Sequence, residues 1–509
     1  MEADLCNAPK VEEDFSTNVK AIAESLYELN LCVRCILRFL KEKTPSAYEG
    51  NNSSIAKYIE EEYGLEYILK EQDTEHNNYD TICKGCLGIL QNGCDTPIVN
   101  KIVDTVQSSG YEFESFTFAI SIPLSTMAYQ HSLLLHLKEK FSKFYDAVRT
   151  ADDLPSIKEV IKWVCGPAVG NALGVYFKHE SPFKISISFH SEGAEKSLDF
   201  LSEVDPSRFT EKKKKKRAPE VPLYSISSIK KALAVLSSAE EMRRFTSCPP
   251  DVPVAQCVCQ QIVCSHGSLL IGGRYNKYSR CLPQTPWLID GERLKESSVQ
   301  EKIINIIGPP IQADDCRFSS SGREDIDVRM LGTGRPFVLE FVNPHRTLLD
   351  EDFLSDMQKQ INSSTKEIAV SGLQVITKGE YSILKDGETK KTKCYSALIW
   401  TKELVPQTEL DKLADIKDLR IEQKTPLRVL HRRPLAVRVR EVHTMSAQRI
   451  DDHHFKLFLK TMAGTYVKEF VHGDFGRTKP NLGTLLGVES DILELDVESV
   501  DVEWPPVRK

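Results

Sequence analysis

Residues 319–341 read SSSGREDIDVRMLGTGRPFVLEF, a turn rich in hydroxyl groups and glycine that leads into an apolar run. The turn delivers the charged side chains of Arg323, Asp325, Asp327 and Arg329 into a predicted hairpin. Opposite charges crowded at the edge of a strand are typical of a functional site. The alternative is that Gly332 and Gly334 turn the hairpin while Asp325 and Arg323 form a solvated surface pair. This stretch alone leaves both interpretations open.

A chain of 509 residues predicts about three domains, since one domain takes ~150 residues. We expect them at 1–99, 100–267 and 268–509. Hydrophobic residues make up 41% and charged residues 27% of the chain, which is typical of a globular protein and not of a disordered one. The N-terminus lacks the pattern of a secretory signal, and no apolar run approaches the ~18 residues that span a membrane. We therefore expect a soluble protein inside the cell, with no membrane partner.

Two cysteine pairs have the spacing of a zinc site. Cys32 and Cys35 form one C-x-x-C pair, and Cys83 and Cys86 form the other. Four thiolates suit tetrahedral Zn²⁺ and leave no position open for water, so we expect a structural role. The long intervening segment has to fold back to bring the pairs together, and four buried thiols remain the alternative. The remaining cysteines of the 257–264 segment are interpreted as core thiols.

Residues 100–265 alternate helical stretches with strands. In FKISISF (183–189) the side chains of Ile185, Ile187 and Phe189 share one face, which predicts a strand of an α/β domain. Residues 225–245 carry Ile229, Leu233 and Leu236 at helical spacing and predict an amphipathic helix. The basic run KKKKKR at 212–217 is expected to be an exposed loop, either a solvated linker or a nuclear-import or RNA-contact segment.

The third region mixes α and β patterns. Strands are expected at LLIGGRY (269–275), YSALIW (395–400) and HHFKLFLK (453–460), and helices at DFLSDMQKQIN (352–362) and YVKEFV (466–471). Polar strings interrupt these elements: GRYNKYSR (273–280), LPQTPW (282–287), GREDIDVR (322–329), GRPFVLE (334–340), VNPHR (342–346), QKTPLRVLHRRPLAVR (423–438) and AGTYVKEFVHGDFGRTKPN (463–481).

This ordered set of strings resembles the archaeal and eukaryotic tRNA pseudouridine synthases that act on uridines 54 and 55 of the TΨC arm. The resemblance implies an α+β fold, in which a catalytic domain with a mixed sheet flanked by helices follows a zinc-containing, THUMP-type α/β region. It also implies tRNA as substrate, a monomer, and a location in the nucleus and cytoplasm, with the mitochondrion as a further compartment.

The resemblance also implies roles for individual residues. Asp325 is the expected catalytic aspartate, and Arg323 helps displace the target uridine. Tyr395 matches the tyrosine that underlies or deprotonates the base. Lys468 in GTYVK stands where related synthases have arginine in GTYIR, as the cation paired with the aspartate. Leu485 is expected to pack against the uracil ring, with Leu482 and Leu486 as alternatives.

The predicted reaction explains why no organic cofactor is expected. The N1–C1′ bond breaks, the uracil turns, and C5 bonds to C1′, so no group is gained or lost. Asp325 either attacks C1′ or takes the C2′ proton, and both roles need an ionised carboxylate, which a nearby cation favours.

Although the net charge is −7, basic residues cluster in strings that predict RNA contacts. Interleaved basic and aromatic side chains suit phosphates beside stacked bases. The candidates are Arg274, Tyr275, Lys277, Tyr278, Arg280, Arg428, Arg432, Arg433, Arg477 and Lys479. Each one alone is equally consistent with a solvated surface charge.

Two other classes of function remain open. One is a zinc-bearing RNA-binding adaptor in small-RNA processing, with primary microRNA and its processing machinery as partners. The other is an RNA methyltransferase or thiolase, which needs a glycine-rich nucleotide loop between a strand and a helix. The string LGTGRP is followed by a predicted strand instead, so it lacks that context.

Overall fold

The computed structural model describes residues 10–64, 81–209, 224–387, 392–431 and 433–506. The basic run 212–217 and Arg432 lie outside the described residues. The chain divides into two compact units, residues 1–265 (unit 1) and 266–509 (unit 2), which are treated separately below. Across the described part of the chain, no helix has the length and apolar character needed to cross a membrane.

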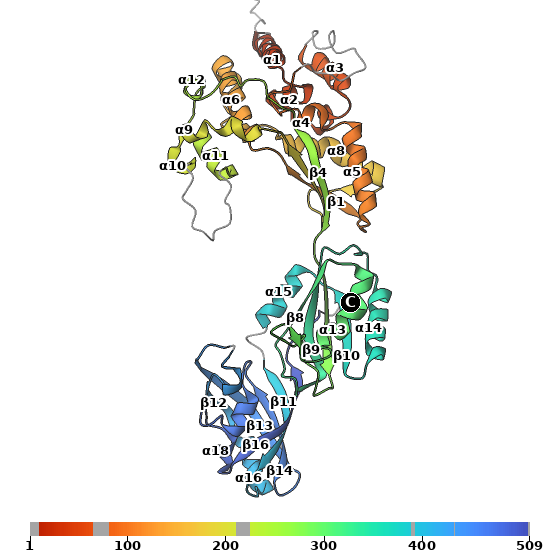
Figure 1. Ribbon diagram of the computed structural model, residues 1–509, viewed down its shortest axis with the longest axis vertical. Coiled ribbons are helices and arrows are strands. Elements are labelled where there is room, and N and C mark those ends of the chain that lie inside the picture. The colour runs from red at the N-terminus through yellow and green to blue at the C-terminus, as the bar shows by residue number, and fades with distance from the viewer. Residues whose placement is uncertain (1–9, 65–80, 210–223, 388–391, 432, 507–509) are drawn as a thin grey trace, which may run out of the picture. The chain divides into compact units, whose positions relative to one another are not determined.

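Unit 1 is rich in helices and contains one four-stranded sheet in the order β2-β1-β3-β4 (Figure 1). Strand β1 pairs in parallel with both β2 and β3. The strands are β1 (Ser115–Ser121), β2 (Tyr176–Phe177), β3 (Phe183–His190) and β4 (Val258–His266). The helices are α1 (Lys10–Glu28), α2 (Val33–Phe39), α3 (Asn52–Tyr63), α4 (Ile89–Asn92), α5 (Thr96–Ser109), α6 (Ser125–Lys140), α7 (Ser142–Tyr145), α8 (Ile157–Leu173), α9 (Leu201–Val204), α10 (Pro206–Phe209), α11 (Ile226–Leu233) and α12 (Ala239–Arg243).

One hydrophobic core runs through most of unit 1, from Ile22 to Cys257, and takes residues from both sides of position 99. The predicted alternation in β3 is present, since Ile185, Ile187 and Phe189 are all buried. The mixed α and β composition of this region agrees with the predicted class. Its THUMP-type assignment stays a prediction.

The single helix predicted over 225–245 is wrong. The segment forms two helices, α11 and α12, with residues 234–238 between them. Ser225 caps the first helix and Ser238 caps the second, each accepting a hydrogen bond from a backbone N–H. A serine that caps a new helix ends the preceding one, because its side chain competes for backbone hydrogen bonds.

Unit 2 is built on a ten-stranded mixed sheet in the order β10-β5-β9-β16-β11-β14-β13-β12-β15, with β8 paired to β9. Neighbours are antiparallel except β9 and β16, which meet in parallel through two residue pairs. The strands are β5 (Leu269–Lys277), β6 (Leu288–Ile289), β7 (Glu292–Arg293), β8 (Asp315–Ser320), β9 (Arg329–Val342), β10 (Ile368–Val375), β11 (Lys393–Thr401), β12 (Lys417–Lys424), β13 (Val437–Arg449), β14 (His454–Thr461), β15 (Thr478–Lys479) and β16 (Ser490–Val500). Strands β6 and β7 form a separate hairpin.

Helices cover this sheet. They are α13 (Val299–Ile311), α14 (Glu351–Ser364), α15 (Lys378–Gly387), α16 (Gln407–Asp411), α17 (Val467–His472) and α18 (Leu482–Leu486). Helices α13 and α14 lie side by side near β10 (Figure 1). Each strand and helix predicted for this region is present, and the predicted mixed sheet flanked by helices is confirmed.

Gly332 and Gly334 do not turn a hairpin, contrary to one of the two interpretations of the opening string. Both lie inside β9, with φ of 56° and 77°. A Cβ on Gly332 would lie 2.0 Å from the carbonyl oxygen of Glu498, and one on Gly334 would lie 2.7 Å from that of Tyr275. These glycines therefore let β9 approach its neighbours closely, as at a bulge.

Candidate active site

Asp325 lies on the loop 321–328, which joins β8 to β9 within the ten-stranded sheet. Lys277, at the end of β5, fastens this loop. Its Nζ donates to the carbonyl oxygens of Asp325 (3.0 Å) and Ile326 (2.9 Å), and also to that of Leu282 (3.0 Å). Lys277 is 0% exposed, and burial lowers its pKa to about 8 against the opposing effect of nearby carboxylates. The backbone that carries Asp325 is thus held from inside the protein.

A buried ion pair holds the residues just before Asp325. The Nε of Arg335 lies 2.8 Å from Oε2 of Glu324, and both side chains are buried. Arg335 also donates from Nη1 to the carbonyl of Ser321 (2.7 Å), and the hydroxyl of Tyr275 donates to Oε1 of Glu324 (2.9 Å). A buried charge pair of this kind needs its remaining hydrogen bonds satisfied, and here they fix the start of the loop.

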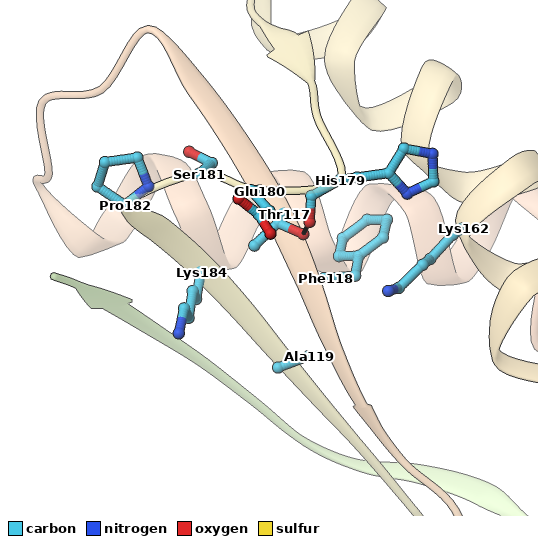
Figure 2. A pocket seen from close by; sticks show the side chains of 9 residues that line it. All are labelled: Thr117, Phe118, Ala119, Lys162, His179, Glu180, Ser181, Pro182 and Lys184. Carbon is cyan, nitrogen blue, oxygen red and sulfur yellow. Dashed lines mark hydrogen bonds between the residues drawn. The ribbon is translucent and has the colours of Figure 1, made fainter.

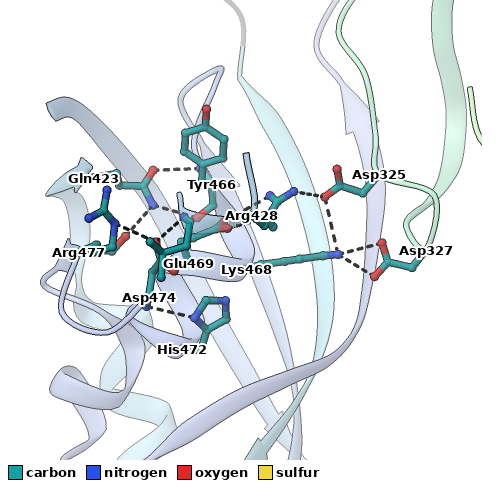
Figure 3. Close-up of polar contacts among 12 residues, drawn as sticks. Asp325, Asp327, Gln423, Arg428, Tyr466, Lys468, Glu469, His472, Asp474 and Arg477 are labelled. Carbon is teal, nitrogen blue, oxygen red and sulfur yellow. Dashed lines mark hydrogen bonds and ion pairs between the residues drawn. The ribbon is translucent and has the colours of Figure 1, made fainter. Parts of the chain in front are cut away.

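The Asp325 carboxylate faces two cations. Arg428 donates from Nη1 to Oδ2 of Asp325 at 2.8 Å, and Nζ of Lys468 lies 3.7 Å from the same oxygen. Lys468 lies closer to Asp327, with 2.8 and 2.7 Å to its two oxygens. Arg428 is anchored in turn by Glu469, whose Oε1 accepts from its Nε at 2.7 Å. Figure 3 shows Lys468 extended toward both aspartates, with Arg428 reaching Asp325 from another direction.

The electrostatics of this cluster favour charged groups. Burial opposes ionisation of Asp327, but the hydrogen bonds and charge of Lys468 outweigh it and lower the pKa of that carboxyl. Burial likewise acts against the charge of Arg428, yet its bond to Glu469 and the charges of Glu469 and Asp325 raise its pKa. Asp325 is 33% exposed, so its carboxylate remains open to a ligand while two cations neighbour it.

The structure changes the roles expected for Lys468 and Arg428. The sequence predicted Lys468 as the partner of Asp325 and Arg428 as a phosphate contact. Arg428 makes the shorter contact with Asp325, and Lys468 bridges both aspartates. Sequence reasoning missed Glu324 and Glu469. Their one available signal was a carboxylate beside a predicted site residue, in GRED and in YVKEF.

Tyr395 lies on β11, partly buried against the core of unit 2. Burial raises the pKa of Tyr395 to about 12, with the charge of Arg335 opposing the shift. Leu485 lies on α18 and is partly buried, as is Leu486, whereas Leu482 is fully buried and cannot meet a ligand.

Four of the residues predicted to contact RNA are instead buried or bonded to other parts of the protein. Tyr275 and Lys277 are 0% exposed, so their predicted surface roles do not hold. Arg274 donates from Nη1 to the carbonyls of Val502 and Trp504, both at 2.8 Å. Arg280 donates to the carbonyls of Asp327 (3.0 Å) and Leu495 (2.9 Å) and pairs with Glu494 and Asp496. Burial of the strand that bears Arg274, Tyr275 and Lys277 explains the difference, because β5 lies between β9 and β10.

The other predicted RNA contacts lie mostly at the surface. Tyr278, Arg433 and Lys479 are exposed. Arg323 is exposed too, and its side chain forms no hydrogen bond or ion pair with a described residue. Arg477 is partly buried and donates from Nη2 to the carbonyl of Thr425 at 2.7 Å. These exposed cations remain available for phosphate.

The two cysteine pairs meet in unit 1. The sulfur atoms of Cys32, Cys35, Cys83 and Cys86 all lie within 4.8 Å of one another and are buried. The Cys32 and Cys86 sulfurs are 3.9 Å apart, close to the about 3.8 Å expected for a tetrahedron with Zn–S bonds of ~2.3 Å. Backbone N–H groups of Cys32 and Leu90 donate to the sulfurs of Cys83 (3.2 Å) and Cys86 (3.3 Å). The group fits a metal ion.

A shallow hollow in unit 1 was not foreseen from the sequence. It encloses about 640 Å³ along β1 and the 179–184 segment, and Figure 2 shows its lining side chains. The lining residues are Thr117, Phe118, Ala119, Lys162, His179, Glu180, Ser181, Pro182 and Lys184. Its polar groups are of mixed charge and do not converge on one point, so its geometry assigns it no chemistry.

Comparisons with known proteins cover nearly the whole chain. The family described as "Pus10, C-terminal" matches residues 270–501, and "Eukaryotic Pus10, N-terminal" matches residues 83–264. A protein of Homo sapiens named tRNA pseudouridine synthase Pus10 is 46% identical over 84% of this chain and 80% of its own length. The Mus musculus protein of the same name is 41% identical over 96% of this chain and 98% of its own.

The chain is also similar to a more distant relative and, weakly, to one solved structure. A Drosophila melanogaster protein, named as a putative tRNA pseudouridine synthase Pus10, is 32% identical over 95% of this chain and 97% of its own length. A structure of a Cbf5-Nop10-Gar1 complex aligns with a TM-score of 0.25 and 17% identity, covering 45% of this chain and 48% of that one. A score at this level establishes no common fold.

Proposed function

The chain belongs to the Pus10 family of tRNA pseudouridine synthases, and from this premise we propose that it isomerises uridine 54, uridine 55 or both in the TΨC arm of tRNA. It is an intramolecular transferase that acts on tRNA. Asp325 acts at the ribose of the target nucleotide. The adaptor alternative gains no support from the names of these relatives.

The observation that carries the catalytic assignment is the setting of Asp325. Its backbone is fixed by Lys277, its carboxylate is partly open, and Arg428 and Lys468 lie 2.8 and 3.7 Å from Oδ2. An ionised carboxylate is needed both to attack C1′ and to take the C2′ proton. The loop contacts hold the reactive group in place before the substrate arrives, which lowers the cost of orienting it.

The reaction is an isomerisation, so its atoms balance without a second substrate. The N1–C1′ bond breaks, the uracil turns, C5 bonds to C1′, and the proton lost from C5 is balanced by one gained at N1. The target uridine has to leave its stack, which costs a few kcal/mol. Tyr395 and Leu485 are the proposed faces that hold the uracil while it turns. Arg323, exposed on the catalytic loop, is the proposed side chain that displaces the uridine.

The four-cysteine group of unit 1 is the proposed site of one structural Zn²⁺. Its sulfur geometry and its hydrogen bonds from backbone N–H groups support this assignment, and four thiolates leave no coordination position for substrate. When bound, the ion crosslinks the start of α2 to the segment that precedes α4. The ion takes no part in the isomerisation.

Mapping the modified position tests the proposed substrate. Unmodified tRNA would be incubated with pure protein, and pseudouridine would be located by chemical mapping. Two further tRNAs would carry cytidine at position 54 or at position 55. We expect pseudouridine at 54, at 55 or at both, with each signal removed by its own cytidine. Pseudouridine only outside the TΨC arm would contradict the proposal.

A further inference from the structure

A loop that follows α17 holds an aromatic ring in solvent. Residues 473–477 read GDFGR, and Phe475 is 93% exposed. The next most exposed aromatic side chain among the described residues, Tyr176 in unit 1, is 75% exposed. A phenyl ring normally stabilises a fold by burial, and this ring contributes almost none.

The backbone under this ring is in an unfavourable conformation. Asp474 has φ of 47° and Phe475 has φ of 55°, in the left-handed region. That region is an outlier for a bulky residue, and it persists only where surrounding contacts impose it. Strain of this kind, held at an exposed position, points to a function outside the fold itself.

Contacts around Asp474 impose this conformation. Its Oδ2 accepts from the backbone N–H of Leu427 at 3.3 Å, and its carbonyl accepts from the N–H of Arg477 at 3.1 Å. The N–H of Thr478 donates to the carbonyl of Gly473 at 3.1 Å, and Arg477 reaches the carbonyl of Thr425 at 2.7 Å. These contacts hold the backbone of the loop that carries Phe475.

The same contacts join the loop to the active site. Leu427, which bonds Asp474, is the neighbour of Arg428, and Arg428 donates to Asp325 at 2.8 Å. In Figure 3, Asp474 and Arg477 lie on one side of Arg428, and Asp325 lies on the other. Phe475 therefore lies on a loop that is hydrogen-bonded to the segment that carries Arg428.

Two lysines lie on the segments next to this loop, since Lys479 follows it in the chain and the N–H of Lys424 donates to the carbonyl of Arg477 at 3.0 Å. Lys424 and Lys479 are exposed, and the Lys479 side chain passes beside Gly476, with its Cε 3.8 Å from the position of a Cβ there. Within the part of the chain that the structure describes, neither lysine forms an ion pair. A nearby aromatic ring and exposed lysines together suit unstacked nucleotides, which bind with a base on a ring and phosphates near cations.

We propose that Phe475 stacks on a nucleobase of the substrate RNA. This inference rests on the proposed function, because it takes the RNA bound at the Asp325 site as given. Phe475 is thus a binding residue that positions the RNA, and it takes no part in bond making.

The test compares three changes in the full-length protein. Phe475→Asn removes the ring and leaves a residue that tolerates the left-handed backbone. Phe475→Tyr keeps a stacking ring. Leu493→Ala removes another exposed apolar side chain, on β16 of the same unit, and serves as the matched control. Affinity for unmodified tRNA would be measured by filter binding at several salt concentrations, and pseudouridine formation by single-turnover kinetics.

We expect Phe475→Asn to bind tRNA about tenfold more weakly, with an unchanged salt slope because no charge is lost. Its thermal midpoint should equal or exceed that of the parent. Phe475→Tyr and Leu493→Ala should bind as the parent does. Phe475→Asn binding as tightly as the parent would overturn the inference, and so would a fall in its thermal midpoint together with affinity, which indicates a structural role. A parent protein that forms no pseudouridine in tRNA would instead overturn the proposed function.

Discussion

At the scale of single residues, the active site is a set of charges with unequal anchoring. Arg428 makes the shorter contact with Asp325 and is held by buried Glu469, whereas Lys468 divides its contacts between Asp325 and Asp327. Arg428 is therefore a fixed counter-charge. The ammonium group of Lys468 shields the carboxylates of Asp325 and Asp327 from each other. Its loss should therefore lower the reaction rate more than the affinity for tRNA.

Substitutions at two lysines, Lys468 and Lys479, separate effects on the reaction rate from effects on tRNA binding. We expect Lys468→Met to lower the single-turnover rate at saturating tRNA on the order of a hundredfold, with little change in affinity, because a preorganised charge at the reacting group is lost. Lys468→Arg should restore part of the rate. Lys479→Met, at an exposed lysine, should show the opposite pattern of weaker binding, a shallower salt slope and a near-normal rate. If Lys468→Met weakened only tRNA binding, that result would contradict a catalytic role for Lys468 beside Asp325.

Lys277 makes a prediction about pH. Its pKa of about 8 in the folded protein lies below the ~10.4 of an unfolded chain. Between these values the unfolded chain binds more protons, so this group makes stability rise with pH. The free energy of unfolding of the parent, minus that of Lys277→Met, should therefore increase from about pH 8 to pH 10 in denaturant titrations. A difference that stays flat or falls over this range would show that the fold does not lower the pKa of Lys277.

These residues show most clearly which features of the site the sequence alone could predict. The string GRED predicts Asp325 as the catalytic residue only together with the other strings, because the turn and its charges alone also fit a surface pair. The string GRYNKYSR misleads, because its basic and aromatic residues suit RNA equally well. Whether they face RNA or the interior depends on which strands flank β5, and those strands come from residues 329–342 and 368–375, far along the chain.

At the scale of elements, β9 organises unit 2. It pairs with β5, β8 and β16, and its start leads directly from the catalytic loop. Alternation and composition predicted most strands and helices here, since each is a local pattern. The close approach of β9 at Gly332 and Gly334 depends on the neighbouring strands. The break between α11 and α12 depends on one capping serine. The pattern of apolar residues predicts neither feature.

Gly332 tests the role of β9. Gly332→Ala should destabilise the protein by well over the ~1–2 kcal/mol of left-handed backbone strain, because its Cβ would lie 2.0 Å from the carbonyl oxygen of Glu498. Gly487→Ala is the matched control, since Gly487 has φ of 71° with nothing within 4 Å of its Cβ, and it should cost only the strain. Thermal unfolding measures both. Equal midpoints for the two variants would contradict the close approach described for β9.

At the scale of the whole molecule, the chain has two units with separate hydrophobic cores. Length and composition predicted about three domains, and this division stays a prediction. The cysteine spacing predicted the four-cysteine group, because C-x-x-C pairs are local and chemically distinctive. The fold-back that joins the pairs was an expectation from chemistry alone. The core shared across position 99 was not foreseen, because contacts between helices far apart in sequence leave no local signature.

Removing the proposed zinc should affect one unit. Purified protein should hold about one zinc ion per chain, and Cys32→Ser/Cys35→Ser should lose it. We expect the thermal transition of unit 1 to fall by several degrees or more, while that of unit 2 stays in place. Cys281→Ser, at an exposed cysteine, should keep its metal and both transitions. Absence of zinc from the parent by elemental analysis would refute the metal site.

The most direct test of the central claim compares Asp325 with its neighbour. Asp325→Asn and Asp327→Asn each remove one carboxylate charge from the cluster around Lys468. Under single-turnover conditions with saturating tRNA, Asp325→Asn should bind tRNA as the parent does and form no pseudouridine above a blank reaction. Asp327→Asn should slow the reaction without abolishing it. Pseudouridine formation by Asp325→Asn at a measurable rate would contradict the assignment of Asp325 as the catalytic residue.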